Sequence, residues 1–245
     1  MLTKDKAICI RVVDYSETSQ IATFFTRENG KIDIIAKGSK RPKSSFGGPL
    51  EIFSCGQILF TYAPSKKLAT LTEFEQLDDY SHISTDLFTY NCSLLAAELL
   101  NNLTTEYNPQ TNLFDSFLEF LRNIKQIQDV LLSLILFQLT LLKELGLQPV
   151  LNKCTNCRCS YSDNWPKVYF SSLANGLLCR DCEANFPDRS QISKTVANCL
   201  SDLKSITKAN QNTLKEIEKL LIHHFTEILN HRPKMAKYVL KEMKI

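Results

Sequence analysis

Four cysteines form two Cys-x-x-Cys pairs in the middle of the sequence. The first pair is Cys154 and Cys157, and the second, 21 residues further on, is Cys179 and Cys182. A two-residue gap lets both thiolates of a pair reach one ion, and four thiolates satisfy the tetrahedral preference of Zn²⁺. Because four thiolates leave no coordination position open, the spacing predicts a zinc ion with a structural role and not a catalytic one.

Three other interpretations of these cysteines were weighed. Two unrelated pairs of buried thiols would have the same spacing, and Cys159 could replace Cys157 as a ligand. A redox dithiol is disfavoured because no βαβ pattern surrounds either pair. The odd total of nine cysteines and the lack of an apolar leader at the N-terminus argue against a disulfide framework.

The densest cationic stretch covers residues 36–48 and carries no acid. Its glycines and serines let backbone amides approach phosphates, and its cations can release condensed counterions. Phe46 could stack on a base, as aromatic rings do in proteins that bind single strands. A solvated loop with no ligand remains an equal alternative. The predicted DNA-binding residues are Lys37, Lys40, Arg41, Lys43 and Phe46.

A second cationic group lies near the C-terminus, where lysines recur at three- and four-residue steps. On a helix this spacing puts them on one face, where they could bind an acidic partner. A solvated helix face with no partner is the commoner explanation of such a pattern. The group consists of Lys234, Lys237, Lys241 and Lys244.

Composition and motifs exclude several other classes of protein. Apolar residues make up 44% and charged residues 22% of 245 residues, and the net charge is only +3. These values predict a globular chain whose polyanion contacts must be local. The longest apolar run, residues 130–142, is too short to span a membrane. We therefore expect a soluble cytoplasmic protein with no membrane contact. No P-loop, GxSxG, HExxH or GxGxxG pattern occurs, so we expect that the protein is not an enzyme.

The elements that must position these residues divide into strands and then helices. β-branched runs separated by turns, including Asn29-Gly30, predict a five-stranded barrel in residues 1–80, either an OB-fold or an SH3-like barrel. The predicted strands are residues 6–14, 20–26, 31–37, 50–62 and 68–74, with a turn at 63–67 between the last two.

From residue 81 to 245 the apolar period is helical, which predicts an α-helical domain that carries the zinc element at 150–186. Residues 130–145 are apolar all round and predict a buried helix that Gly146 ends. A capping box at 213–216 predicts a helix start, and Pro233 predicts the first turn of a last helix over 234–244. The fold class is therefore α+β.

The order of these features resembles the RecO family of bacterial recombination and repair mediators. The resemblance rests on residues 17–20 (ETSQ), 36–44 (AKGSKRPKS), 47–50 (GGPL), 144–157 (ELGLQPVLNKCTNC), 169–170 (YF) and 176–182 (GLLCRDC). It implies an N-terminal OB-fold, an α-helical domain and a four-cysteine zinc element. The chain departs from the family pattern at Arg158 and Asn175, where glycine is usual, and at Asn152, where aspartate is usual.

The resemblance also implies an activity and a set of partners. The activity is binding of single- and double-stranded DNA, annealing of strands, and loading of recombinase onto DNA coated by single-strand-binding protein, at the nucleoid. The partners are RecR and the acidic C-terminal tail of single-strand-binding protein. A zinc-ribbon protein of the RNA-binding or transcription class is the main alternative, and a preference for RNA would reveal it. A metal-dependent hydrolase is disfavoured because four thiolates close the site.

Overall fold

The computed structural model describes residues 2–62, 68–78, 80–124 and 130–243, and the predicted turn at 63–67 lies outside them. Contacts divide the chain into two compact units, Met1–Lys125 and Gln126–Ile245, and each is described by itself. No helix in the described ranges is long and apolar enough to cross a membrane. The first unit holds β1 (Leu2–Asp14), β2 (Gln20–Thr26), β3 (Gly30–Ala36), β4 (Cys55–Thr61), β5 (Ala69–Asp78), the 3₁₀ turn η1 (Ser81–Thr85), α1 (Leu87–Leu103) and α2 (Thr111–Asn123).

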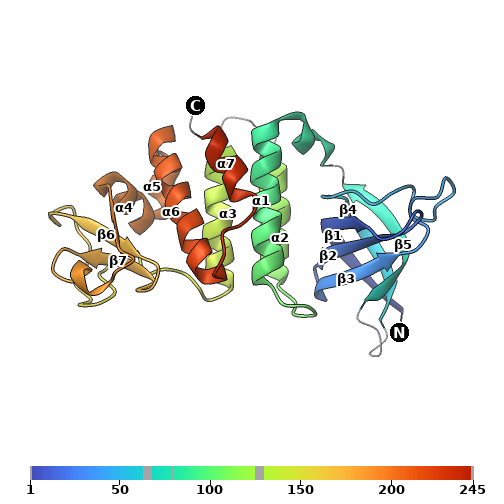
Figure 1. Ribbon diagram of the computed structural model, residues 1–245, viewed down its shortest axis with the longest axis horizontal. Helices are drawn as coiled ribbons and strands as arrows, with labels where there is room; N and C mark the ends of the chain where they lie inside the picture. The colour runs from blue at the N-terminus through green and yellow to red at the C-terminus, as the bar shows by residue number, and fades with distance from the viewer. Residues whose placement is uncertain (1, 63–67, 79, 125–129, 244–245) are drawn as a thin grey trace. The chain divides into compact units, whose positions relative to one another are not determined.

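The five strands close into a barrel in the order β1-β2-β3-β5-β4, with β4 pairing back onto β1 (Figure 1). All pairs are antiparallel except the short β3–β5 pair, where Ile34 and Ile35 lie opposite Ala69 and Thr70. This order confirms the OB-fold and removes the SH3-like alternative. Alternate residues of β3 point into the barrel, as its period-two pattern predicts.

The turn between β2 and β3 is docked against the segment that joins α1 to α2. Lys31 Nζ donates to the carbonyls of Asn101 and Thr104 at 2.5 and 2.6 Å, where α1 ends and carbonyls lack partners within the helix. The backbone of Gly30 lies so close to Asn108 that a Cβ would stand 2.3 Å from its carbonyl oxygen. Only glycine fits this contact, so the close approach of the turn to the helical segment requires glycine at position 30.

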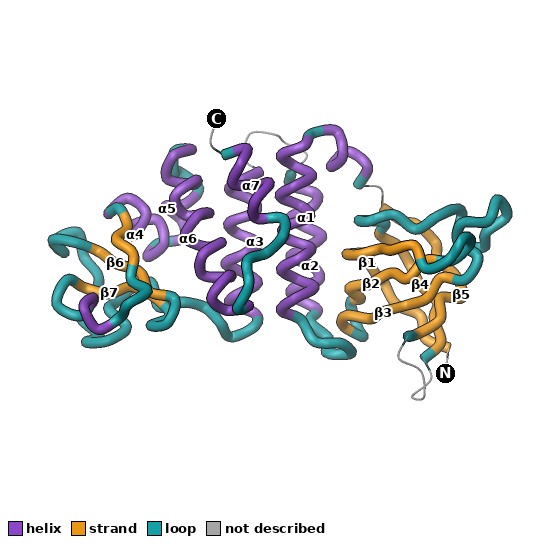
Figure 2. Tube along the Cα trace, viewed as in Figure 1, coloured by secondary structure: helices purple, strands orange, loops and turns teal. Residues whose placement is uncertain are grey.

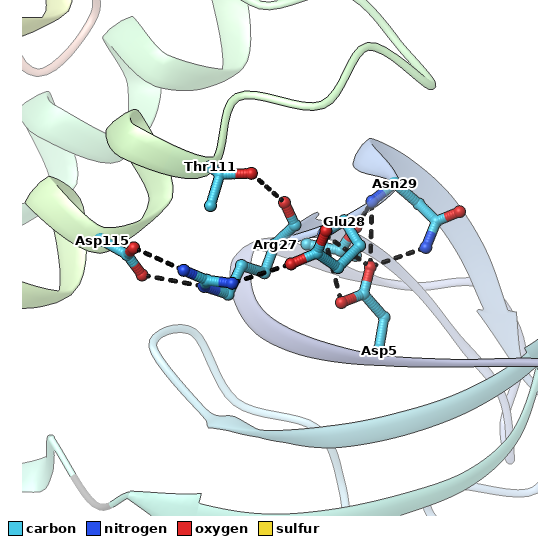
Figure 3. Close-up of polar contacts among 7 residues, drawn as sticks. Asp5, Arg27, Glu28, Asn29, Thr111 and Asp115 are labelled. Atoms are coloured by element: carbon cyan, nitrogen blue, oxygen red, sulfur yellow. Dashed lines mark hydrogen bonds and ion pairs between the residues drawn. The ribbon is translucent and has the colours of Figure 1, made fainter.

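Charged side chains fix the same turn from two sides (Figure 3). Asp5, which is buried on β1, accepts hydrogen bonds from the backbone of Glu28 and from the backbone and side chain of Asn29. Arg27 donates two parallel hydrogen bonds to Asp115 of α2, at 3.1 and 2.9 Å. The Arg27 guanidinium lowers the pKa of the Asp115 carboxyl, which stays ionised and keeps the pair.

The second unit combines a helical core with a small three-stranded sheet, drawn purple and orange in Figure 2. Its helix α3 packs on α6, and the short strands run in the order β7-β6-β8. The elements are α3 (Val130–Glu144), β6 (Val168–Ser171), β7 (Gly176–Cys179), η3 (Glu183–Asn185), β8 (Ser190–Ile192), α4 (Lys194–Ser201), α5 (Leu203–Ile206), α6 (Gln211–Leu229) and α7 (Ala236–Glu242).

Three of the predicted helix ends can be compared with the structure. Gly146 follows α3 at φ 70°, and the Leu147 N–H bonds back to the Leu142 carbonyl, which confirms the predicted stop. The capping box at 213–216 is wrong, because Asn210 is the N-cap and accepts from the Thr213 N–H at 2.9 Å. Pro233 does not open the last helix, which begins only at Ala236.

A buried polar pair lies between α3 and α6. Gln138 and Glu218 are both fully buried, and Gln138 Nε2 donates to Glu218 Oε1 at 3.0 Å. Glu218 Oε2 finds no partner among the described residues. Burial raises the pKa of Glu218 to about 8, so the carboxyl is protonated in the folded state at neutral pH.

This pair predicts a pH dependence of stability. The folded pKa lies above the ordinary value of 4.5, so the contribution of Glu218 to the unfolding free energy should fall as pH rises from about 4.5 to about 8 and level off above that. Each unit of difference corresponds to roughly 1.4 kcal/mol. Glu218→Gln should abolish this loss, measured by urea unfolding between pH 5 and 8.5. Glu216→Gln, an exposed change on the same helix, should keep it, and equal pH profiles for all three proteins would contradict the assignment.

Candidate nucleic-acid and metal-binding sites

Residues 37–54 join β3 to β4, and we call them the basic loop. A buried side-chain amide anchors this loop to the barrel at two points. Gln20 Oε1 accepts from the Ser39 hydroxyl at 2.9 Å and from the Leu50 N–H at 2.8 Å. Gln20 Nε2 donates to the Leu50 carbonyl at 3.2 Å. Since Gln20 and Ser39 are buried, water does not compete for these bonds, and the cationic part of the loop is held between two anchored points.

Three of the four predicted cations of the basic loop are exposed, and one is paired. Lys37, Arg41 and Lys43 are exposed and form no ion pair with any residue in the described ranges. Lys40 is half-buried and donates to Asp14 Oδ2 at 2.7 Å, which lowers the pKa of that carboxyl. The surface therefore offers three cations to a polyanion, while the charge of the fourth is largely compensated.

The structure corrects the expectation for Phe46. Its side chain is 8% exposed and belongs to the barrel core, together with Leu50 and Phe74. A ring in that position packs against aliphatic and aromatic neighbours and presents no face to a base. Phe46 is therefore an apolar anchor of the basic loop, and the burial of an aromatic ring outweighs the polar character of the surrounding sequence.

The four predicted cysteines come together in the second unit. All four Sγ atoms lie within 4.8 Å of one another. Cys157 and Cys179 have their sulfurs 3.7 Å apart, close to the roughly 3.8 Å edge of a tetrahedron with 2.3 Å metal–sulfur bonds. Cys154, Cys179 and Cys182 are buried, and Cys157 is exposed. This donor set fits a tetrahedral metal ion.

The backbone around the cluster supports this fit. The Cys179 N–H points at the Cys154 sulfur at 3.5 Å, a bond that stabilises a thiolate. Hydrogen bonds from the backbone and side chain of Cys159 lower the pKa of the Cys157 thiol to about 6, whereas burial raises the pKa of Cys179. A bound cation would offset the cost of ionising the buried thiols, since only thiolates are ligands.

Cys159 lies beside the cluster without belonging to it. Its sulfur is 3.3 Å from that of Cys157, and its carbonyl accepts from the Cys154 N–H at 2.8 Å. Within the described part of the chain, the four predicted cysteines are the only group of this kind whose sulfurs all lie close to one another. The geometry thus favours Cys157 as the ligand and gives Cys159 a supporting place in the turn.

The predicted lysine row is shorter than the sequence pattern indicates. Lys237 and Lys241 are exposed on α7, but Lys234 precedes the first residue of that helix, and Lys244 lies outside the described residues. The Lys237 ammonium stands 4.6 Å from the ring centre of Tyr238. The helix therefore carries two of the four lysines on a regular face.

Two models of known protein families match successive parts of the chain. The profile described as Recombination protein O N terminal matches residues 1–80, and the one described as Recombination protein O C terminal matches residues 84–237. The chain belongs to the RecO family.

A protein named DNA repair protein RecO from Bacillus pumilus is 29% identical over 98% of this chain and 94% of its own length. The RecO proteins of Halalkalibacterium halodurans and Bacillus subtilis are 31% and 33% identical, over 92% and 82% of this chain and 89% and 76% of their own lengths. Membership places the chain among the mediators of recombination and DNA repair.

The departures from the RecO pattern at Arg158 and Asn175 fall on left-handed backbone. Arg158 has φ 65° and Asn175 has φ 51°. Glycine adopts this conformation without strain, and asparagine tolerates it better than most residues. At Gly176 a Cβ would stand 2.2 Å from the Val150 carbonyl oxygen, so this glycine is required where β7 meets the chain leading to the cysteines. Asn175 and Gly176 lie at the turn that joins β6 to β7.

Two features of this RecO-family chain escape sequence reasoning. Gln20 is one of many glutamines, and nothing in its neighbours shows that its amide is buried. A pocket of about 620 Å³ in the second unit has an apolar wall and two exposed lysines, Lys143 and Lys153, and its lining extends from Leu136 to Ser201. The apolar wall includes Leu136, Leu139, Val150, Leu151 and Leu200.

Proposed function

We propose that this chain is a non-enzymatic mediator that binds single- and double-stranded DNA through the basic loop. The observation that carries the proposal is the anchoring of three exposed, unpaired cations on a loop that Gln20, Phe46 and Leu50 hold in place. Preset cations bind phosphates at little cost in chain entropy. Such contacts are independent of sequence, as strand annealing and recombinase loading require.

The DNA proposal predicts a change in salt dependence. Replacing Lys37 and Lys43 with alanine removes two phosphate contacts, so the log–log slope of affinity against salt should flatten by about 1.8 units on duplex and about 1.4 on single strands. Affinity at fixed salt should fall similarly for different sequences. Fluorescence anisotropy with labelled oligonucleotides measures both quantities.

Asp14→Asn is the matched opposite change. It frees Lys40 from its ion pair and removes a carboxylate, so affinity should rise and the slope should steepen. Wild-type affinity and slope in the double lysine variant would show that the basic loop is a solvated turn, and the DNA surface would have to lie elsewhere.

We propose further that the cysteine cluster holds one structural Zn²⁺. Four thiolates favour zinc among the common divalent ions, and they leave no site for substrate. The segment from Asn152 to Asn185 holds only two four-residue strands and one short 3₁₀ turn. Such a segment has little core of its own, so a metal would supply its stability.

The zinc proposal predicts metal content and stability together. The purified reduced protein should hold one zinc per chain, and Cys179→Ser should lose it and reduce the unfolding free energy by several kcal/mol. Cys159→Ser is the control, because this sulfur lies outside the four-sulfur group and its loss should leave zinc bound. Metal analysis and thermal unfolding test both. A zinc-free wild type, or loss of zinc in the Cys159 variant alone, would contradict the assignment.

For partners we propose RecR and the acidic tail of single-strand-binding protein, and the structure offers two surfaces for the tail. One is the lysine row, of which Lys237 and Lys241 lie on α7. The other is the 620 Å³ pocket, whose apolar wall could take an apolar chain end while Lys143 and Lys153 face acidic residues. The pocket supplies both burial and charge, and it is the better supported of the two.

Two double variants separate these surfaces. An acidic peptide with an apolar C-terminal end should bind the wild type. The double variant Lys143→Ala with Lys153→Ala should bind this peptide about tenfold or more weakly at low salt, because two positive charges beside the acidic residues of the peptide are lost. Lys237→Ala with Lys241→Ala should leave the affinity unchanged. Titration calorimetry measures the affinity of each variant for the peptide. Weaker binding by the Lys237/Lys241 variant, with unchanged binding by the Lys143/Lys153 variant, would assign the tail to the lysine row.

A further inference from the structure

We infer that Tyr15 is a stacking platform for an unpaired base, placed beside the phosphate-binding cations of the basic loop. The inference rests on the proposed DNA binding and names the residue that would let the same surface distinguish single strands from duplex. Tyr15 begins the turn between β1 and β2. In OB-folds this first inter-strand loop is one of those that bind oligonucleotides.

The ring of Tyr15 is available to a ligand. Its side chain is 64% exposed, more than that of any other aromatic residue in the described ranges. The backbone beneath it is ordered by the turn, because the Tyr15 and Ser16 N–H groups both bond to the Ser19 carbonyl, at 3.0 and 3.2 Å. An exposed ring on a fixed backbone can stack without a large loss of entropy.

The turn of Tyr15 is bonded directly to the basic loop. The Lys40 N–H donates to the Thr18 carbonyl at 3.1 Å, and the Gly38 N–H donates to the Ser19 hydroxyl at 3.3 Å. The ion pair between Lys40 and Asp14, the residue before Tyr15, adds a third connection. The turn that carries the ring is therefore joined to the loop that carries the cations, and Lys40 compensates the carboxylate of the residue that precedes Tyr15.

This arrangement assigns two kinds of contact to one strand of nucleic acid. Phosphates bound by Lys37, Arg41 and Lys43 leave the attached bases within reach of the adjoining turn. A base that is free of a duplex can lie on the Tyr15 ring, whereas a base within a duplex is already stacked on its neighbours. The buried Phe46 cannot fill this role, since the barrel core covers its ring.

The test uses the full chain with Tyr15→Ala and Tyr15→Phe. On labelled oligo(dT), Tyr15→Ala should lower affinity by roughly 5- to 150-fold, which is the range for loss of one base stack. Its salt slope and its affinity for duplex should stay as in the wild type, because stacking releases few ions. Tyr15→Phe should bind as the wild type does. Tyr238→Ala, which removes another exposed ring from the second unit, should have no effect.

A second measurement locates the contact. Photocrosslinking of the wild type to an oligonucleotide that carries 5-iodouracil should label the peptide that contains Tyr15, and mass spectrometry should identify it. Wild-type single-strand affinity of Tyr15→Ala would overturn the inference while the lysine variants still test the DNA proposal. Equal weakening on duplex and single strands would also overturn it, since that is the result of a displaced loop. If the wild type binds no DNA, both proposals fall.

Discussion

The docking of the β2–β3 turn against the α1–α2 segment is the constraint on which the first unit depends. A side chain at Gly30 would collide with the backbone of Asn108, and Lys31 binds carbonyls where α1 ends. Asp5 and the Arg27–Asp115 pair fix the turn from the barrel and from α2. Because these contacts occupy one end of β2 and β3, the loops at the other end of the same strands are the ones left to bind a ligand.

At that other end of the strands, the buried side chain of Gln20 holds the basic loop against the barrel by hydrogen bonds. Gln20 bonds both Ser39 and Leu50, in addition to the backbone bonds that join the basic loop to Thr18 and Cys9. Burial of Phe46 and Leu50 adds an apolar anchor to this polar one. The hydrogen bonds of Gln20 set the position of the loop, and the apolar contacts of Phe46 and Leu50 exclude water from these bonds. The backbone that carries the cations of the loop is therefore held in one position.

Sequence patterns predict the features of this chain that repeat at a fixed period. Strand alternation and the two Cys-x-x-Cys pairs depend on local geometry, and the barrel and the four-sulfur cluster were both found where expected. The burial of Phe46 depends on tertiary contacts of the loop, which no local pattern contains. Asn210 and Thr213 are both residue types that cap helices, and the sequence pattern does not show that Asn210 is the N-cap. The grouping of α1 and α2 with the barrel follows from contacts such as Arg27–Asp115, 88 residues apart, which no local pattern contains.

The segment that carries the cysteine cluster is joined to the helical core of the second unit by specific bonds. Tyr161 donates to Asn198 of α4 at 2.6 Å, and Ser172 contacts His224 of α6 at 3.1 Å. The chain that runs into Cys154 supplies Val150, Leu151 and Lys153 to the wall of the 620 Å³ pocket. The proposed zinc ion, by fixing the cysteines, would therefore also fix one wall of that pocket. On the functions proposed above, the cluster acts on partner binding through the pocket, whereas the proposed DNA surface depends on Gln20 and the barrel.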